Sequence, residues 1–128
     1  MEKFYWFIIF ISLNSLILVG LAGYVSKLRL KYKISFGDGG NKHLLKAMRT
    51  HSNGTEQVPI FALIILSFTL LDYSQTIIAI LVMLFTLARL SHAVGMLLRV
   101  HIFRQIGATV TYLLQIIGPV MLLIKVII

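Results

Sequence analysis

The chain has 128 residues, of which 59% are hydrophobic and only 12% charged, with a mean hydropathy of +0.94. A soluble domain has roughly 25% charged residues, so this composition excludes a soluble protein and indicates an integral membrane protein of one domain, residues 1–128. The net charge of +8 does not indicate nucleic acid binding, because the basic residues gather where hydrophobic runs end, and the lack of cysteine excludes disulfides, thiolate metal sites and a cysteine nucleophile.

The first predicted element is a membrane-spanning helix over residues 4–29. Residues 4–26 are uncharged, and a run of about 23 residues can cross a bilayer with some tilt. No small-residue cleavage motif follows, so we expect a retained helix rather than a removed signal peptide. Alternating basic residues end the helix, and a loop with three glycines follows over residues 34–41.

A second helix is predicted over residues 42–71, with Asn41 as its N-terminal cap. Its uncharged part covers about 15 residues, whereas a bilayer core needs about 20. The helix therefore reaches a spanning length only by taking Asn53, Glu56 and Arg49 toward the membrane. Ionisable groups at that depth are costly, and they usually face the bundle interior or a water-filled cavity.

A third helix is predicted over residues 75–99 and a fourth over residues 104–127, joined by a short connection at residues 100–103. Both contain runs long enough to cross a bilayer. The third helix carries Arg89 and His92 inside its span. Together the four elements predict an all-α integral membrane four-helix bundle.

Four spans place both chain ends on one side of the membrane. The first and third loops are basic, whereas the second carries only Asp72. The positive-inside rule then predicts that loops one and three face the cytoplasm and that both termini lie outside.

Helix two offers a polar face. Arg49, Asn53 and Glu56 follow i, i+4, i+7 spacing and share one side of the helix. One interpretation is a structural network that joins helices through hydrogen bonds. The other is a site for a zwitterionic ligand, in which Glu56 accepts from an ammonium, Arg49 holds a carboxylate by a fork contact, and Asn53 can do either.

Helix three offers two further candidates. Arg89 lies in the middle of its span and needs a partner, and Glu56 is the best candidate because the other three acids lie at span ends. We therefore predict a structural ion pair for Arg89. His92 lies one turn further on the same face, and both a core role and a ligand-binding role remain open for it.

Arg104 opens the fourth helix, near the membrane level of Arg29 and Arg49. It is either an interfacial cation or, where several arginines converge, a group that lowers the pKa of a thiol and favours the thiolate. Because the chain has no cysteine, that thiol would have to come with a substrate. No metal site is predicted, since the four histidines lack a ligand spacing such as His-Glu-x-x-His.

These motifs resemble those of one known family. The run Arg49-x-His51-x-Asn53-x-x-Glu56-x-x-Pro59 resembles the helix-two signature of the MAPEG family, the membrane-associated proteins in eicosanoid and glutathione metabolism. Arg89-x-x-His92 resembles its helix-three motif, and Arg29 and Arg104 fall where the family has arginines. The resemblance covers nearly the whole chain, and the loop over residues 31–40 is similar to that of the compact bacterial branch, often called YecN-like.

The resemblance implies a homotrimer in the bacterial inner membrane, with glutathione as co-substrate in a U shape between subunits near the cytoplasmic face. It implies that glutathione contacts five residues, namely Arg29, Arg49, Asn53, Glu56 and His92, and that Arg104 is the catalytic residue that stabilises the thiolate. Some members have tyrosines where this chain has Ala108 and Met96, and Tyr112 lies a turn beyond Ala108, so thiolate stabilisation here would depend on Arg104.

Three functions follow as hypotheses. The first is a glutathione transferase or peroxidase whose second substrate, a hydrophobic small molecule with an electrophilic centre, enters from the lipid bilayer. The second is a non-enzymatic lipid-binding scaffold of the same fold. The third is a proton-coupled exporter that titrates Glu56, which the arginines around that carboxylate disfavour.

Overall fold

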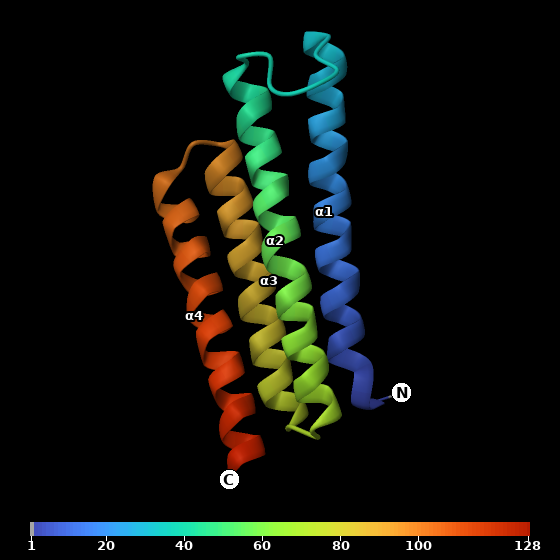
Figure 1. The fold of residues 1–128 in the computed structure, drawn as a ribbon, viewed down its shortest axis with the longest axis vertical. Helices are drawn as coiled ribbons and strands as arrows, with labels where there is room; N and C mark the ends of the chain where they lie inside the picture. Colours follow the sequence, from blue (N-terminus) through green and yellow to red (C-terminus); the bar gives the residue numbers. More distant parts are fainter. Residues whose placement is uncertain (1) are drawn as a thin grey trace.

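The computed structural model describes residues 2–128, which form an all-helical bundle (Figure 1). A short 3-10 helix is followed by four long α-helices: η1 (Glu2–Phe4), α1 (Tyr5–Tyr32), α2 (Lys42–Leu70), α3 (Gln75–Leu97) and α4 (His101–Ile127). The helices run alternately up and down, so both termini lie at the same end (Figure 1). Each of the four is long and apolar enough to cross a membrane, which confirms the predicted fold class.

The helix ends differ from the predicted ones where the chain turns. α1 continues to Tyr32 rather than stopping at residue 29, and Lys33 then closes it in a left-handed conformation with φ 55°. α3 stops at Leu97, because Arg99 also has positive φ (61°) and the Val100 N–H donates to the Gly95 carbonyl at 3.0 Å. This left-handed closure is a common helix ending. α4 begins immediately afterwards, so most of the predicted connection at residues 100–103 is helical.

α2 is one continuous helix that carries both the polar and the apolar half of its sequence. The Asn41 side-chain oxygen accepts from the backbone N–H groups of His43 and Leu44, each at 3.0 Å, which confirms the predicted cap. The helix continues through Pro59 to Leu70. Polar residues near its N-terminus are therefore held on the same rigid element as the apolar residues that pack into the core.

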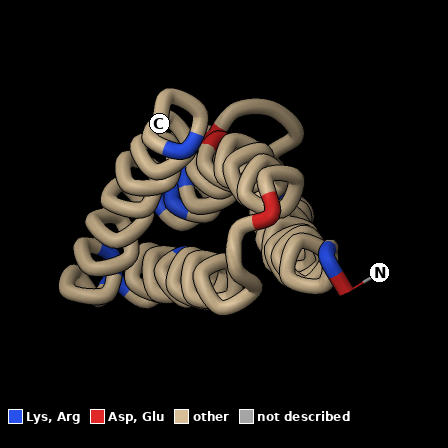
Figure 2. The backbone as a smooth tube through the Cα atoms, turned by 90° about the horizontal axis from the view of Figure 1, so that it is seen from below, with Lys and Arg blue, Asp and Glu red and all other residues tan. Residues whose placement is uncertain are grey.

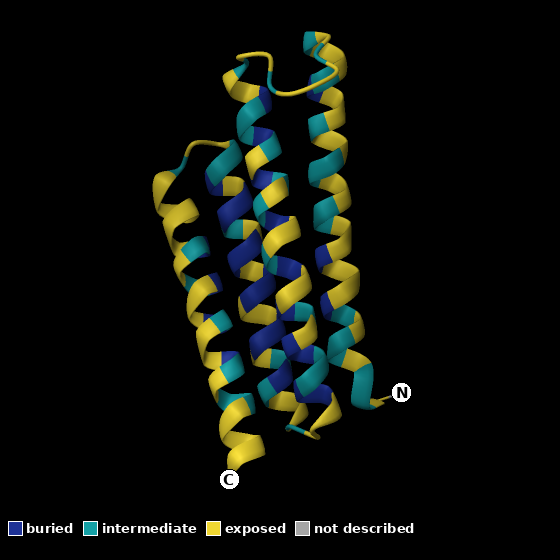
Figure 3. Ribbon diagram, viewed as in Figure 1, coloured by how far each residue is buried: buried dark blue, intermediate teal, exposed yellow. Residues whose placement is uncertain are grey.

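The core lies mainly between α1, α2 and α3, and Leu114 of α4 completes it. The Phe61 and Phe85 rings stack with their centroids 4.0 Å apart, and Phe10 packs against them at 5.7 and 5.5 Å. All three side chains are fully buried. Figure 3 shows buried residues concentrated on α2 and α3, whereas α1 and α4 are largely exposed along their outer faces. In a bilayer those outer faces meet lipid, so packing and hydrogen bonds between helices hold the bundle together.

Hydrogen bonds join parts of the bundle that are far apart in the sequence, and two of them illustrate this. The buried Asn14 amide on α1 donates to the Thr86 hydroxyl on α3 at 3.0 Å. The Tyr73 hydroxyl, in the turn between α2 and α3, donates to the Met121 carbonyl on α4 at 2.8 Å. Because hydrocarbon offers no competing partners, such bonds fix the register of membrane helices.

α3 and α4 approach closely at Gly107. A β-carbon added there would lie 2.5 Å from the Ala88 carbonyl oxygen and 2.5 Å from the His92 backbone nitrogen. Gly107→Ala should therefore push α4 away from α3 and destabilise the fold by about 1–3 kcal/mol. Thermal unfolding of the purified protein in detergent, followed by circular dichroism, measures the effect.

The matched control for this prediction is Gly20→Ala on α1. A β-carbon at position 20 would meet nothing within 4 Å, and alanine is the better helix former. We expect Gly20→Ala to unfold at the wild-type temperature or above it. Equal unfolding temperatures for the two variants would show that the close approach of α4 to α3 is not needed for stability.

Candidate functional site at the basic end of the bundle

Most of the positive charge lies at the end of the bundle where the α1–α2 and α3–α4 connections are found. Nine of the twelve lysines and arginines belong to the residues 27–49 and 99–104 that make up this basic end. At the opposite end, which faces the viewer in Figure 2, Lys3 Nζ lies 2.8 Å from Asp72 Oδ1. This exposed pair is the one salt bridge among residues 2–128. The cations of the basic end are therefore available to a ligand.

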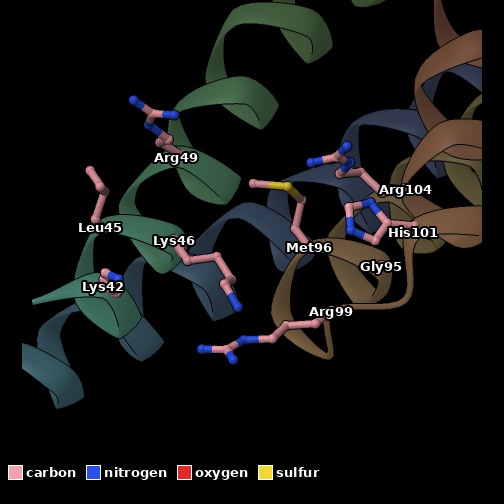
Figure 4. Close-up of a pocket in the computed structure, with 9 residues that line it drawn as sticks. All are labelled: Lys42, Leu45, Lys46, Arg49, Gly95, Met96, Arg99, His101 and Arg104. Atoms are coloured by element: carbon pink, nitrogen blue, oxygen red, sulfur yellow. The ribbon is translucent and has the colours of Figure 1, made fainter.

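A cavity of about 340 Å³ opens at the basic end between α2, α3 and the start of α4. Nine residues line it, as Figure 4 shows: Lys42, Leu45, Lys46, Arg49, Gly95, Met96, Arg99, His101 and Arg104. Five of the described lining residues are lysine or arginine, and none is an acid. Like charges held together at a partly desolvated site repel one another, so the cavity favours an anionic ligand.

The structure brings Arg49 and Arg104, two of the predicted site residues, to the same cavity. Gly95 makes this possible, because a β-carbon there would clash with the backbone nitrogen of Arg104. The absence of a side chain on α3 lets the first turn of α4 pack directly against it. The Arg104 guanidinium then lies beside Met96, opposite Arg49 on α2 (Figure 4).

A second polar group lies deeper in the bundle, between α2 and α3. The Arg89 guanidinium donates from Nη2 to the Asn53 side-chain oxygen at 2.7 Å, and the same nitrogen lies 3.5 Å from His92 Nδ1. Arg89 is 4% exposed and His92 7%. Arg89 and His92 are buried and Asn53 is partly buried, so the three predicted residues form one cluster inside the bundle, in which Arg89 has no acidic partner among the described residues.

The predicted ion pair between Arg89 and Glu56 is absent from the described chain, and Asn53 takes its place. Glu56 is exposed, and one of its carboxylate oxygens accepts from the Ser52 hydroxyl at 3.2 Å. Asn53 rather than Glu56 binds Arg89 because the two residues point in different directions around the α2 axis. At about 100° per residue, Asn53 and Glu56 are separated by about 60° around the helix, so Asn53 faces α3 while Glu56 faces outward.

Arg49, which borders the basic cavity, and Glu56 lie in line along α2. Their seven-residue separation is two turns, and both side chains are exposed. The predicted polar face of α2 is thus divided: Asn53 belongs to the cluster inside the bundle, whereas Arg49 and Glu56 present opposite charges to the surroundings of the chain.

Arg29 does not join the other predicted residues within one chain. Its Nη1 donates to three carbonyl oxygens of the α1–α2 loop, those of Ile34, Ser35 and Gly37, at 3.3, 3.4 and 2.9 Å. It lines a separate cavity of about 440 Å³ formed by the end of α1 and the start of this loop. Within the monomer, Arg29 therefore holds the loop.

Four polar lining residues of the basic cavity were not predicted from the sequence: Lys42, Lys46, Arg99 and His101. The i, i+4, i+7 spacing of the lysines with Arg49 was the available signal on α2. Arg99 had no such signal, because its position depends on the left-handed turn after α3. Within residues 2–128, no group of three His, Cys, Asp or Glu residues is placed to hold a metal ion.

Comparison with known proteins gives two findings. A family model described as "MAPEG family" matches residues 7–124 of the chain. The inner membrane protein YecN of Escherichia coli K12 is 31% identical to it over 101 residues, which are 78% of this chain and 76% of YecN. The YecN of Escherichia coli O6:H1, strain CFT073, matches with the same identity and coverage.

Proposed function

This chain belongs to the MAPEG family, and we propose that it is a glutathione transferase or peroxidase of the bacterial inner membrane that acts on hydrophobic electrophiles. One observation carries the proposal: Arg49 and Arg104, from different helices, line one cavity that has five lysines and arginines and no acid among its described lining residues. Such a cavity suits a ligand with carboxylates and a thiol that must ionise.

Glutathione matches, group by group, the side chains of this cavity and of the neighbouring part of α2, where Glu56 lies two turns beyond Arg49. Its two carboxylates suit arginine forks such as that of Arg49, and its ammonium suits the exposed carboxylate of Glu56. Arg89 fixes the Asn53 oxygen, so the Asn53 amide nitrogen can donate to the ligand with little loss of side-chain freedom. We assign His92, which neighbours Arg89, to the inner wall of the same site.

Arg104 is the residue to which we assign catalysis. Its guanidinium would stabilise the glutathione thiolate, which attacks the electrophilic carbon of the second substrate. A carbon–sulfur bond forms, the leaving group departs with its electron pair, and the thiol proton goes to water. Met96 lines the cavity beside Arg104, so no phenol hydroxyl assists at that position.

The exposure of Glu56 supports assembly into a trimer. A span of about 20 residues, counted back from the end of α2 at Leu70, includes Glu56. A carboxylate facing lipid at that depth would be costly. A second copy packed against this face of α2 would cover Glu56 and enclose the ligand between subunits, and it could bring its own Arg29 to the site.

The orientation follows from charge. We place the basic end in the cytoplasm, in accordance with the positive-inside rule, and both termini outside. Glutathione would then enter the cavity from the cytoplasm, and the hydrophobic substrate would reach it from the bilayer along the exposed apolar faces of the helices.

The proposed activity is tested with the purified protein, glutathione and chlorodinitrobenzene, an activated aryl halide. We expect conjugation, followed by absorbance, at a rate that rises with protein concentration and saturates with glutathione. Saturable glutathione binding without conjugation of this substrate or reduction of a lipid hydroperoxide would favour the lipid-binding scaffold instead.

Glu56→Gln should weaken glutathione binding by about 10- to 100-fold, because a charge-assisted hydrogen bond to the ammonium becomes a neutral one. Isothermal titration calorimetry measures the affinity. Glu2→Gln is the matched control, since Glu2 is an exposed acid at the opposite end and should leave the affinity unchanged. Equal affinities for wild type and Glu56→Gln would remove Glu56 from the site.

A further inference from the structure

Three cations of the basic cavity lie further from the membrane centre than Arg49 and Arg104. We call Lys42, Lys46 and Arg99 the outer tier. Lys42 is the first residue of α2, and Arg49 lies about 10 Å deeper along the helix axis. Arg99 precedes α4, whereas Arg104 lies one turn inside it. In Figure 4 the outer tier occupies the lower part of the cavity and Arg49 and Arg104 the upper part.

Two side chains of the outer tier converge from different elements. The Lys46 ammonium on α2 and the Arg99 guanidinium in the α3–α4 turn extend toward the same region of the cavity mouth (Figure 4). Both groups only donate hydrogen bonds, and no described acid lines the cavity. Two cations directed at one space without a shared acceptor are stabilised when an anion lies between them.

The backbone holds Arg99 in this position. Arg99 has φ 61°, a conformation that residues with a side chain rarely adopt, and the hydrogen bond from Val100 N–H to the Gly95 carbonyl closes the turn around it. A glycine would adopt this conformation more readily. Lys33 has the same left-handed conformation at the end of α1, so this helix ending fixes the position of Arg99 at the cavity without itself indicating a ligand.

The start of α4 adds a second source of positive potential. Val100, at the N-cap, makes no side-chain hydrogen bond to the helix, and His101, the first helical residue, lines the cavity. The free N–H groups and the positive end of the helix dipole therefore lie at the edge of the same cavity, where Figure 4 shows His101 beside Arg104. Helix N-termini with adjacent basic side chains bind phosphate groups.

We propose that the outer tier binds the phosphate headgroup of an anionic phospholipid from the surrounding leaflet. Basic pockets between membrane helices bind such headgroups, and this one opens at the ends of three spans. Leu45 and Met96 give the cavity apolar walls, and exposed Leu98 and Ile102 flank Arg99 and His101 in the sequence. An acyl chain can pack along these apolar residues, whereas a free phosphate ion has no apolar part that would contact them. This ligand is distinct from glutathione and uses other residues.

Native mass spectrometry of the full chain in detergent tests the proposal, with phosphatidylglycerol and phosphatidylcholine added in turn. Wild type should retain phosphatidylglycerol in preference to phosphatidylcholine. The double variant Lys46→Gln/Arg99→Gln should bind phosphatidylglycerol about 30-fold more weakly, since each cation near a lipid headgroup contributes about fivefold. The control Lys27→Gln/Lys31→Gln removes the same charge from exposed positions at the same end and should bind within about twofold of wild type.

Three other outcomes would overturn the inference. Equally weakened phosphatidylglycerol binding in both double variants would mean that the lipid is attracted to the basic end in general and not to the outer tier. Displacement of phosphatidylglycerol by an equal concentration of inorganic phosphate would replace the lipid with a free anion. Loss of glutathione binding in Lys46→Gln/Arg99→Gln, with its unfolding temperature unchanged, would make the outer tier part of the glutathione site. Failure of wild type to bind glutathione, with the lipid preference intact, would leave this inference standing and reject the proposed function.

Discussion

Replacing Arg104 with alanine is expected to lower the rate of glutathione conjugation by about tenfold to a hundredfold. Arg104 is the innermost cation on the α4 side of the basic cavity, and it is exposed within the chain, so its loss should leave the fold intact. Without the guanidinium, the pKa of the bound thiol returns toward about 8.5, and less thiolate is present at neutral pH.

The pH dependence distinguishes this role from a structural one. A lowered thiol pKa keeps the wild-type rate high at neutral pH, and the rate falls as the pH drops through that pKa. In Arg104→Ala the profile should shift to higher pH, so that activity recovers as the pH approaches about 8.5. Arg104→Lys, which keeps a point charge without the fork, should be intermediate. Lys27→Ala removes an exposed cation from the same end and should retain full activity. A uniform loss at every pH would contradict thiolate stabilisation by Arg104.

Asn53→Leu is expected to destabilise the protein by about 2–3 kcal/mol, the largest effect on stability that we predict for the site. The Asn53 side-chain oxygen is 2.7 Å from Arg89, which is 4% exposed and has no acid beside it in the described chain. Leucine would leave that guanidinium buried among still fewer acceptors. The unfolding temperature in detergent measures the loss.

The double variant Arg89→Met/Asn53→Leu is the control for this prediction. Removing the charge together with its acceptor should restore most of the wild-type stability, since two apolar side chains of similar size can replace a buried polar pair. Glutathione binding should remain weak in the double variant because the Asn53 amide is still missing. Full recovery of both stability and glutathione affinity would mean that the cluster is purely structural.

The fold was predictable from the sequence because each of the four helices is long and hydrophobic enough to cross a membrane. The helix ends were less predictable, because left-handed residues such as Lys33 and Arg99 carry no composition signal. Both positions hold long cationic side chains where glycine or asparagine would be usual.

The site was predictable in part. The motif residues Arg49 and Arg104 do meet at one cavity, and Asn53 meets Arg89. The predicted partner of Arg89 was wrong, because Arg89 binds Asn53 rather than Glu56. The two residues are about 60° apart around α2, and their spacing in the sequence does not say which of them faces α3. The convergence of Lys46 and Arg99 arises from tertiary packing and could not be read from either segment.

The central claim is that Arg104 stabilises the thiolate of glutathione bound at the basic cavity. Ultraviolet difference absorption of glutathione added to the purified protein at neutral pH tests it most directly, because the thiolate absorbs where the thiol does not. We predict a saturable thiolate signal with wild type that is lost in Arg104→Ala. No signal with wild type, or an equal signal with both proteins, would contradict the claim.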